Sequence, residues 1–341
     1  MTGKRSVIRI AEKFHLDVKR VEMIKSGVYR LVSNSGRQYC LKRMNYPLRY
    51  LKWMDVSLRE LRQQGFRKLA WRNPHTPQGR ILFVRAHGNT APYILTPWLL
   101  GRQPVPTSKE DMNTCAKALA HFHKVGHLIK VSKTGKQNFA GKWPKILNAR
   151  ARVLKQAVAK AKQSRGQSEL DLILRKHGDA LLERANSAIS RLQQSPYHET
   201  CLESSPKITL CHGDSGPKNF VLTAQGPAMI DFETLRIDFR VYDLFRLIRL
   251  AGKKNDWDFS IAQTILDSYR SVTELNSNEY DWLMVWLEFP HKVCKVLAHY
   301  QRATQAKKRA LISKIRKAIR NEQKLQPFLQ NLAAYAKERG A

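Results

Sequence analysis

Hydrophobic and polar positions divide the chain into a short strand-rich part and a longer helical part. In the first part, alternating apolar residues with β-branched and aromatic side chains predict strands. Leu51, Met54, Leu58 and Leu61 recur at helical spacing and predict a helix over residues 48–67. We expect turns at 33–37 and at Gly88-Asn89-Thr90. The predicted strands are 21–32, 38–44, 81–86 and 93–98.

Helical patterns dominate the rest of the chain, from residue 99 to residue 341. Pro104 and Pro106 interrupt the chain before a helix predicted to run to about residue 124. A helical insert follows at 143–196, with a break at Gly166, and a helical tail occupies 302–341. Two short apolar strands, 208–211 and 228–232, flank a polar loop. We therefore predict an α+β fold with a small antiparallel-sheet lobe (1–98) and a larger, mainly helical lobe (99–341).

Positive charge is the most unusual feature of the composition. The 341 residues include 61 Lys and Arg against 27 Asp and Glu, a formal net charge of +34. Such a field attracts acidic proteins, anionic polymers, nucleic acid or lipid headgroups, or it serves only to keep the protein soluble. Charge constrains association and leaves the fold open. The insert and the tail are especially basic.

Cysteine and histidine patterns exclude several classes of site. The five cysteines are far apart and form no C-x-x-C pair, which argues against a disulfide framework and a zinc site. His121 and His123 lie two apart on a predicted helix and point in different directions, so we expect packing roles. No apolar stretch is long enough to span a bilayer, and the N-terminus lacks a signal-peptide core. We expect synthesis in the cytoplasm.

The segment that carries chemistry is the polar loop between the two short strands. The first strand delivers His212-Gly-Asp214 to the loop, Asn219 follows five residues later, and Asp231 ends the second strand. Phosphoryl transfer from ATP needs a carboxylate to accept or orient the proton of the attacking hydroxyl, and oxygen ligands for Mg²⁺. The protein-kinase catalytic loop places Asp and Asn at this same spacing. We therefore predict Asp214 as the base, with Asn219 and Asp231 as Mg²⁺ ligands.

The strand-rich lobe contributes candidate residues for binding ATP. Lys42 lies on the second predicted strand, where kinases place the lysine that contacts the nucleotide phosphates. Glu60 on the following helix is the candidate to pair with Lys42. Gly27 is the single glycine where kinases have a glycine-rich loop, and backbone N–H groups there can still meet phosphate. Thr96 and Trp98 belong to a segment that we expect to act as a hinge and to offer backbone groups to adenine.

These residues resemble the aminoglycoside phosphotransferase and choline kinase superfamily, which shares the protein-kinase fold. The motif His212-Gly-Asp214 with Asn219, and Ile-Asp231-Phe-Glu233 downstream, is typical of it. The resemblance implies that Asp243 is the aspartate that steadies the catalytic loop. Gly216 stands where protein kinases carry a phosphate-contacting lysine, and Lys218 is the nearby candidate for that contact.

A closer resemblance, over residues 20–300, is to the CotS-type spore-coat proteins of endospore-forming bacteria. It rests on segments such as Ala118-Leu-Ala-His-Phe-His123 and Leu287-Glu-Phe-Pro-His291. It implies synthesis in the mother cell and location in the spore coat. Three functions stay open: a phosphotransferase acting on a hydroxyl of a small molecule or coat component, a catalytically silent assembly protein that binds acidic coat proteins or anionic polymer, and a nucleic-acid-binding protein. No nucleic-acid-binding module is recognisable, and charge alone supports only non-specific binding.

Overall fold

The computed structural model describes residues 3–87, 90–130, 136–164, 168–203 and 205–339. The described residues form two compact units. The first unit comprises Met1–Pro104, Leu128–Lys133 and Lys218–Leu235, and the second comprises Val105–His127, Thr134–Pro217 and Arg236–Ala341. Two predicted features, the centre of the turn at 88–90 and the helix break at Gly166, lie outside the described residues.

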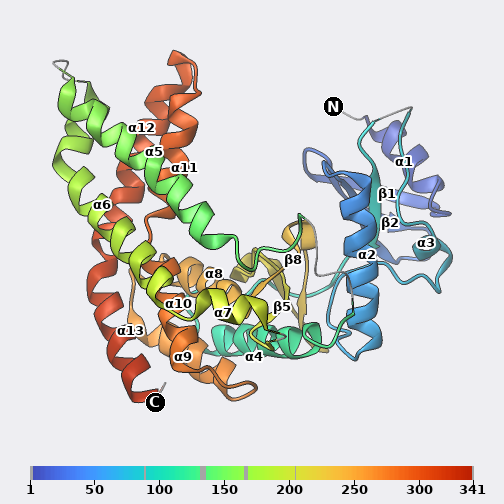
Figure 1. The fold of residues 1–341 in the computed structure, drawn as a ribbon. Helices are drawn as coiled ribbons and strands as arrows, with labels where there is room; N and C mark the ends of the chain where they lie inside the picture. Colours follow the sequence, from blue (N-terminus) through green and yellow to red (C-terminus); the bar gives the residue numbers. More distant parts are fainter. Residues whose placement is uncertain (1–2, 88–89, 131–135, 165–167, 204, 340–341) are drawn as a thin grey trace. The chain divides into compact units, whose positions relative to one another are not determined.

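An antiparallel sheet of four strands, in the order β1-β2-β3-β4, forms the centre of the first unit (Figure 1). The strands are β1 (Val18–Lys25), β2 (Val28–Ser33), β3 (Gln38–Arg43) and β4 (Tyr93–Pro97). The remaining elements of this unit before β4 are α1 (Lys4–Glu12), α2 (Leu48–Gln63) and α3 (Pro77–Arg80). Val7, Ile10 and Ala11 of α1 join a buried core with Leu31, Leu41 and Leu95 of the sheet. The predicted antiparallel sheet is thus confirmed, whereas α1 was not predicted.

Two of the predicted strands differ from those observed. Residues 21–32 form parts of β1 and β2, because the chain turns at Ser26-Gly27 with Gly27 at a φ of 77°. Glycine adopts this left-handed conformation without steric cost, so it marks the turn. Residues 81–86 do not form a regular strand: Val84 makes an isolated bridge to Tyr93.

A hairpin from the middle of the chain completes the first unit. It consists of β6 (Phe220–Thr223) and β7 (Gly226–Met229), flanked by the short 3₁₀ helices η1 (Pro217–Asn219) and η2 (Phe232–Thr234). Met229 exchanges backbone hydrogen bonds with the segment 68–70, and Leu222 does so with Arg102. The first unit therefore extends beyond residue 98 and includes the metal-ligand candidates Asn219 and Asp231.

The second unit is mainly helical around one short pair of strands. Strands β5 (Ile208–Cys211) and β8 (Arg236–Phe239) pair antiparallel, and α4 and α8 pack against β5. Its helices before β5 are α4 (Lys109–Gly126), α5 (Trp143–Gln163), α6 (Glu169–Gln194) and α7 (Tyr197–Leu202). Its helices after β8 are α8 (Arg240–Gly252), α9 (Phe259–Arg270), α10 (Ser277–Glu288), α11 (His291–Gln301), α12 (Gln305–Gln323) and α13 (Leu325–Arg339).

The helical insert is anchored at the start of α5. The indole Nε1 of Trp143 donates a hydrogen bond of 2.9 Å to the buried carboxylate of Asp238 on β8. The guanidinium of Arg236 lies 3.8 Å from the ring centre of Tyr242 and 4.4 Å from that of Phe139, and it forms an ion pair of 3.0 Å with Asp238. Burial raises the pKa of Asp238 to about 6. These contacts fix the insert to the strand pair from which the loop with His212 and Asp214 continues.

No helix in the described part of the chain is both long enough and apolar enough to cross a membrane.

We expect the buried ion pair between Asp55 and Arg72 to be important for the stability of the first unit. The carboxylate of Asp55 accepts hydrogen bonds from Arg72 Nε and from Trp71 Nε1, at 2.6 and 2.8 Å. Asp55→Ala should lower the free energy of unfolding by about 3–5 kcal/mol, because it leaves a buried guanidinium without its carboxylate. Urea unfolding followed by circular dichroism measures this change.

Asp179→Ala is the matched control for this prediction. The pair between Lys162 and Asp179 has a similar distance, 2.7 Å, but both side chains are at least half exposed. Removing it should cost less than about 1 kcal/mol. Equal losses in the two variants would contradict the role given to burial.

Candidate functional site

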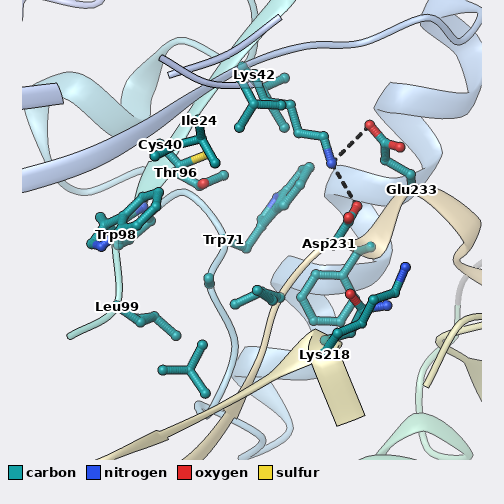
Figure 2. Close-up of a pocket in the computed structure, with 18 of the residues that line it drawn as sticks. Ile24, Cys40, Lys42, Trp71, Thr96, Trp98, Leu99, Lys218, Asp231 and Glu233 are labelled. Carbon is teal, nitrogen blue, oxygen red and sulfur yellow. Dashed lines mark hydrogen bonds and ion pairs between the residues drawn. The ribbon is translucent and has the colours of Figure 1, made fainter. Parts of the chain in front are cut away.

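A pocket of about 430 Å³ lies within the first unit (Figure 2). Its residues come from the sheet, from the segment after β4 and from the β6–β7 hairpin. Apolar side chains such as Ile24, Val28 and Ile94 form much of the wall, and charged groups gather at one end. A concave, mostly apolar pocket with a few convergent polar groups is typical of a small-molecule site.

Lys42 is the charged centre of this pocket. Its ammonium group lies 2.7 Å from Asp231 Oδ1 and 3.0 Å from Glu233 Oε1, as Figure 2 shows. Burial alone would lower the pKa of Lys42, but the two carboxylates outweigh it and raise the pKa above its ordinary value. Lys42 is therefore held as a cation beside two carboxylates, an arrangement that can bind both phosphate and a metal ion.

The β6–β7 hairpin brings Asn219 and Asp231 to the same pocket. Phe220 pairs with Met229, so the residues just outside the hairpin ends lie opposite each other. The backbone N–H of Ile230 donates to the backbone oxygen of Asn219 at 2.9 Å, which continues this register. Asp231 then adopts a left-handed conformation, with φ 64° and ψ 59°. Such a conformation is uncommon for a residue other than glycine and is often found at functional sites.

The segment after β4 forms another wall of the pocket and contains Thr96 and Trp98. The backbone N–H of Trp98 donates to Gln38 O at 3.0 Å, so this donor is already used by the sheet. Gly101 lies so close to Leu222 that any Cβ at this position would overlap the Leu222 carbonyl. The close approach fixes the path of the segment along the hairpin.

Trp71 is a pocket residue that the sequence analysis missed. Its ring lines the pocket below Lys42 in the view of Figure 2. The indole N–H donates a hydrogen bond to Asp55. Trp71 follows no helical or strand periodicity, because it lies in an irregular segment. The only signal in the sequence is a large aromatic residue followed by arginine, Trp71-Arg72, which is too common to identify a site.

Two of the predicted nucleotide-binding residues lie elsewhere. The carboxylate of Glu60 accepts a hydrogen bond from the backbone N–H of Lys130, while Lys42 pairs with Asp231 and Glu233. The predicted pair between Glu60 and Lys42 is therefore wrong in this structure, because the carboxylates next to Lys42 come from the segment after β7. Gly27 lies in the β1–β2 turn and is not a lining residue, whereas its neighbours Lys25 and Val28 are.

Cys40 is a further residue of the pocket wall. Burial raises the pKa of its thiol to about 11, although Lys42 acts in the opposite direction. The thiol therefore stays protonated at neutral pH and serves as part of the apolar wall.

In the second unit, Asp243 holds the loop that carries His212 and Asp214. Its carboxylate accepts the backbone N–H of His212 at 2.7 Å and that of Gly213 at 2.8 Å. It also lies 3.1 Å from Nε2 of the buried His123, whose Nδ1 contacts the hydroxyl of Tyr269. The predicted packing role of His123 thus extends to a hydrogen-bonded network beneath the loop.

Asp214 is paired with a residue that the sequence analysis did not select. Its carboxylate forms an ion pair with the guanidinium of Arg246 on α8. Gly216 packs directly against the side chain of Leu250, one turn further along α8. Helix α8 therefore orients both the candidate base and the loop that follows it.

The comparison with protein-family models decides the family. The model of the phosphotransferase enzyme family, APH, matches residues 19–284. The chain belongs to this family. This match includes the pocket, the His212-Gly-Asp214 loop and Asp243, all within residues 19–284.

Solved structures share the fold of this member of the family over nearly its whole length. An aminoglycoside phosphotransferase from Alicyclobacillus acidocaldarius has 22% identity and a TM-score of 0.79, with 97% of this chain and 96% of that chain covered. Spectinomycin phosphotransferase APH(9)-Ia, in complex with ADP and spectinomycin, has 14% identity and a TM-score of 0.67, with 98% of each chain covered. Amicoumacin kinase hAmiN, with AMP-PNP and Ca²⁺, has 15% identity and a TM-score of 0.61 over 96% and 97% of the chains. The predicted kinase-like fold is confirmed.

A curated relative of this phosphotransferase family member is spore coat protein S of Bacillus subtilis (strain 168). It is 25% identical over 211 residues, which cover 60% of this chain and 58% of the relative. The predicted resemblance to spore-coat proteins is thus confirmed as a distant relationship over part of each chain.

The network beneath the loop predicts a pH dependence of stability. Burial lowers the pKa of His123 below its ordinary value of 6.5, although Asp243 opposes the shift. Below about pH 6.5 the unfolded chain therefore binds a proton that the folded chain does not, and stability falls as the pH falls. For one proton the loss cannot exceed about 1.4 kcal/mol per pH unit. Urea unfolding of wild type and His123→Gln between pH 7.5 and 5.5 measures it, and the variant should show the smaller pH dependence.

Proposed function

We propose that this protein is an ATP- and Mg²⁺-dependent phosphotransferase that acts on a hydroxyl acceptor. The observation that carries the proposal is Lys42 of β3, held within 3.0 Å of Asp231 and Glu233 in a pocket that also contains Asn219. A lysine beside hard oxygen ligands suits a nucleotide triphosphate with its metal ion, because the lysine and the metal share the phosphate charge. The family match and the ADP and AMP-PNP complexes of structural relatives support this proposal.

The segment after β4 provides the adenine contact in this proposal. Because Trp98 N–H points to Gln38 in the sheet, the alternation along an extended chain turns the C=O of Pro97 and the N–H of Leu99 to the opposite side. Both residues line the pocket (Figure 2). The C=O of Pro97 would accept a hydrogen bond from the adenine edge, and the N–H of Leu99 would donate one to it. The adenine ring would pack among Ile24, Ile94 and Trp98.

The metal site in this proposal consists of the Asp231 carboxylate and the Asn219 side-chain oxygen. Both are oxygen donors, as Mg²⁺ requires, and both line the pocket next to Lys42. The bound ion would neutralise charge on the phosphates. Lys218 also lines the pocket and would add a second cation for the phosphates. It would take over from the phosphate-contacting lysine of protein kinases, whose position is occupied by Gly216 in this chain.

Asp214 is the proposed catalytic base. Its ion pair with Arg246 orients the carboxylate, which would accept a hydrogen bond from the acceptor hydroxyl. Asp243 is a positioning residue, because it acts on the loop through the N–H groups of His212 and Gly213.

The second candidate function is a kinase-shaped assembly protein of the spore coat without catalytic activity. The distant relationship with spore coat protein S favours it, as do the single Gly27 in place of a glycine-rich loop and the net charge of +34. In this alternative the basic surface would bind acidic coat proteins or anionic polymer. For both functions we propose synthesis in the mother cell followed by location in the spore coat.

Binding of Mg-ATP distinguishes the two functions. Isothermal titration calorimetry should detect binding to the wild type, and Asp231→Ala should weaken it at least about tenfold, because a charge-assisted metal contact is lost. Asp214→Asn should retain Mg-ATP binding and lose phosphoryl transfer. If the wild type binds no nucleotide, or the Asp231→Ala variant binds it as tightly, the phosphotransferase proposal is wrong and the assembly function remains.

The adenine contact has its own test in Leu99→Pro. Proline removes the backbone N–H at this position but keeps an apolar side chain. We expect at least about a fivefold loss of Mg-ATP affinity, the value of one hydrogen bond, while Leu99→Ala should retain most of the affinity. Thermal unfolding of both variants checks that the fold is intact. Similar affinities for Leu99→Pro and Leu99→Ala would exclude the hinge contact.

A further inference from the structure

Helices α11 and α12 form a hairpin that carries a second groove. They pack against each other and are joined by the short segment 302–304 (Figure 1). Helices linked by so short a connection run antiparallel. A groove of about 420 Å³ lies at the connected end of the hairpin, and its residues come from the end of α11, the connection and the first turns of α12. We call it the basic groove, for the cations that line it.

The lining of the basic groove is partly apolar, although α12 is a highly charged helix. The apolar residues that line it are Ala303, Ala306, Ala310 and Leu311. Leu311 is half-buried, whereas Ala306 and Ala310 are exposed, and their short side chains leave space above them. A concave apolar surface gains most from an apolar side chain of a ligand, because that contact removes both surfaces from water.

Cations surround this apolar lining. Lys307, Lys314 and His299 also line the basic groove, and all three are exposed. On α11, Lys295 and Lys292 lie four and seven residues before His299 and therefore share its face of the helix. Partial burial, followed by the charges of Lys295 and Lys314, lowers the pKa of Lys292. The positive charge thus continues from the groove along both helices.

The acidic residues of this region are engaged away from the basic groove. Helix α11 contains no acidic residue, and Glu322 of α12 is buried and paired with Arg249 and Arg184. Arg316, on another face of α12, pairs with Glu169 of α6. Within the described residues, no carboxylate forms an ion pair with either lysine that lines the groove. The rim is therefore complementary in charge to a ligand that carries carboxylates.

The combination of an apolar lining and a basic rim favours one class of partner. Nucleic acid and polyphosphate would use the charge, but they offer no aliphatic side chain for the lining. A helix that binds membranes exposes bulky apolar residues, whereas the large apolar side chains of α12, such as Ile315 and Ile319, are buried. A second copy of this chain would be repelled by the net charge of +34. An acidic amphipathic helix matches both the lining and the rim.

We propose that the basic groove binds an acidic amphipathic helix of a protein partner. Its apolar side chains would pack on Ala306, Ala310 and Leu311, and its carboxylates would pair with Lys307 and Lys314. This stretch of α12 rises roughly 12 Å, which accommodates about two turns of the partner helix. The inference is independent of the proposed phosphotransferase activity, and it locates the acidic-protein contact that the second candidate function assumes.

Two synthetic peptides with the same charge test the inference. The first is a labelled peptide of roughly 15 residues with Glu on one face of a helix and Leu on the other, and the second has Ser in place of each Leu. Fluorescence anisotropy should show that the wild type binds the Leu peptide at least about tenfold more tightly, because burial of leucine adds to the attraction of charge. Added salt should weaken both peptides and leave this preference in place.

Variants separate the groove from the general charge of the chain. Lys307→Glu/Lys314→Glu should weaken binding of the Leu peptide at least about tenfold, because carboxylates would then face carboxylates. The control Lys19→Glu/Lys52→Glu changes the net charge equally at exposed positions of the first unit and should retain most of the affinity. Ala310→Arg adds a cation but fills the apolar lining, so it should weaken the Leu peptide and not the Ser peptide. Circular dichroism and thermal unfolding check that each variant is folded.

Several outcomes would overturn the inference. They are equal binding of the two peptides by the wild type, equal losses in the two double variants, and tighter binding of the Leu peptide by Ala310→Arg. Binding of polyphosphate or phosphatidylserine vesicles that depends on Lys307 and Lys314, without a preference for the Leu peptide, would assign the groove to a polymer or a membrane instead. Mg-ATP should bind Lys307→Glu/Lys314→Glu as it binds the wild type, so failure of the groove and failure of the phosphotransferase are measured separately.

Discussion

The ion pairs of Lys42 with Asp231 and Glu233 are the interaction on which the candidate nucleotide site depends. They join the third strand of the sheet to a segment almost 190 residues later in the chain. Desolvation of a lysine is unfavourable, and only the two carboxylates make the buried cation acceptable. The pocket is therefore preorganised by electrostatics: the same charges that hold Lys42 are those that can hold a metal ion next to phosphate.

The second unit uses a carboxylate in a different way. Asp243 is fully buried, and its carboxylate is satisfied by the backbone N–H groups of His212 and Gly213 and by His123. Hydrogen bonds from His123 hold its pKa below the ordinary value, even though burial alone would raise it. The backbone of His212 and Gly213, just before Asp214, is thus held by a buried carboxylate. Arg246 then sets the orientation of Asp214 itself.

The sequence was sufficient for those features that depend on local patterns and on spacing. The antiparallel sheet followed from alternation, and Asn219 and Asp231 were predicted from their spacing in the kinase-type motif. The structure gives the physical basis of that spacing, because the register of the β6–β7 hairpin brings both residues to the same end. Contacts between distant segments were not predictable. Glu60 was paired with Lys42 by analogy, although Glu233 had the same charge and lay beside Asp231. Trp71 was missed because its role depends on Asp55, sixteen residues earlier.

The net charge of the chain and the ion pairs of the pocket act over different ranges. A charge of +34 acts at long range, is screened by salt and attracts any polyanion. Lys42 is instead partly buried and lies within 3.0 Å of the carboxylates of Asp231 and Glu233, where salt screens the interaction less. The net charge therefore favours association with polyanions in general, whereas the geometry of the pocket depends on a few short-range ion pairs that are independent of it.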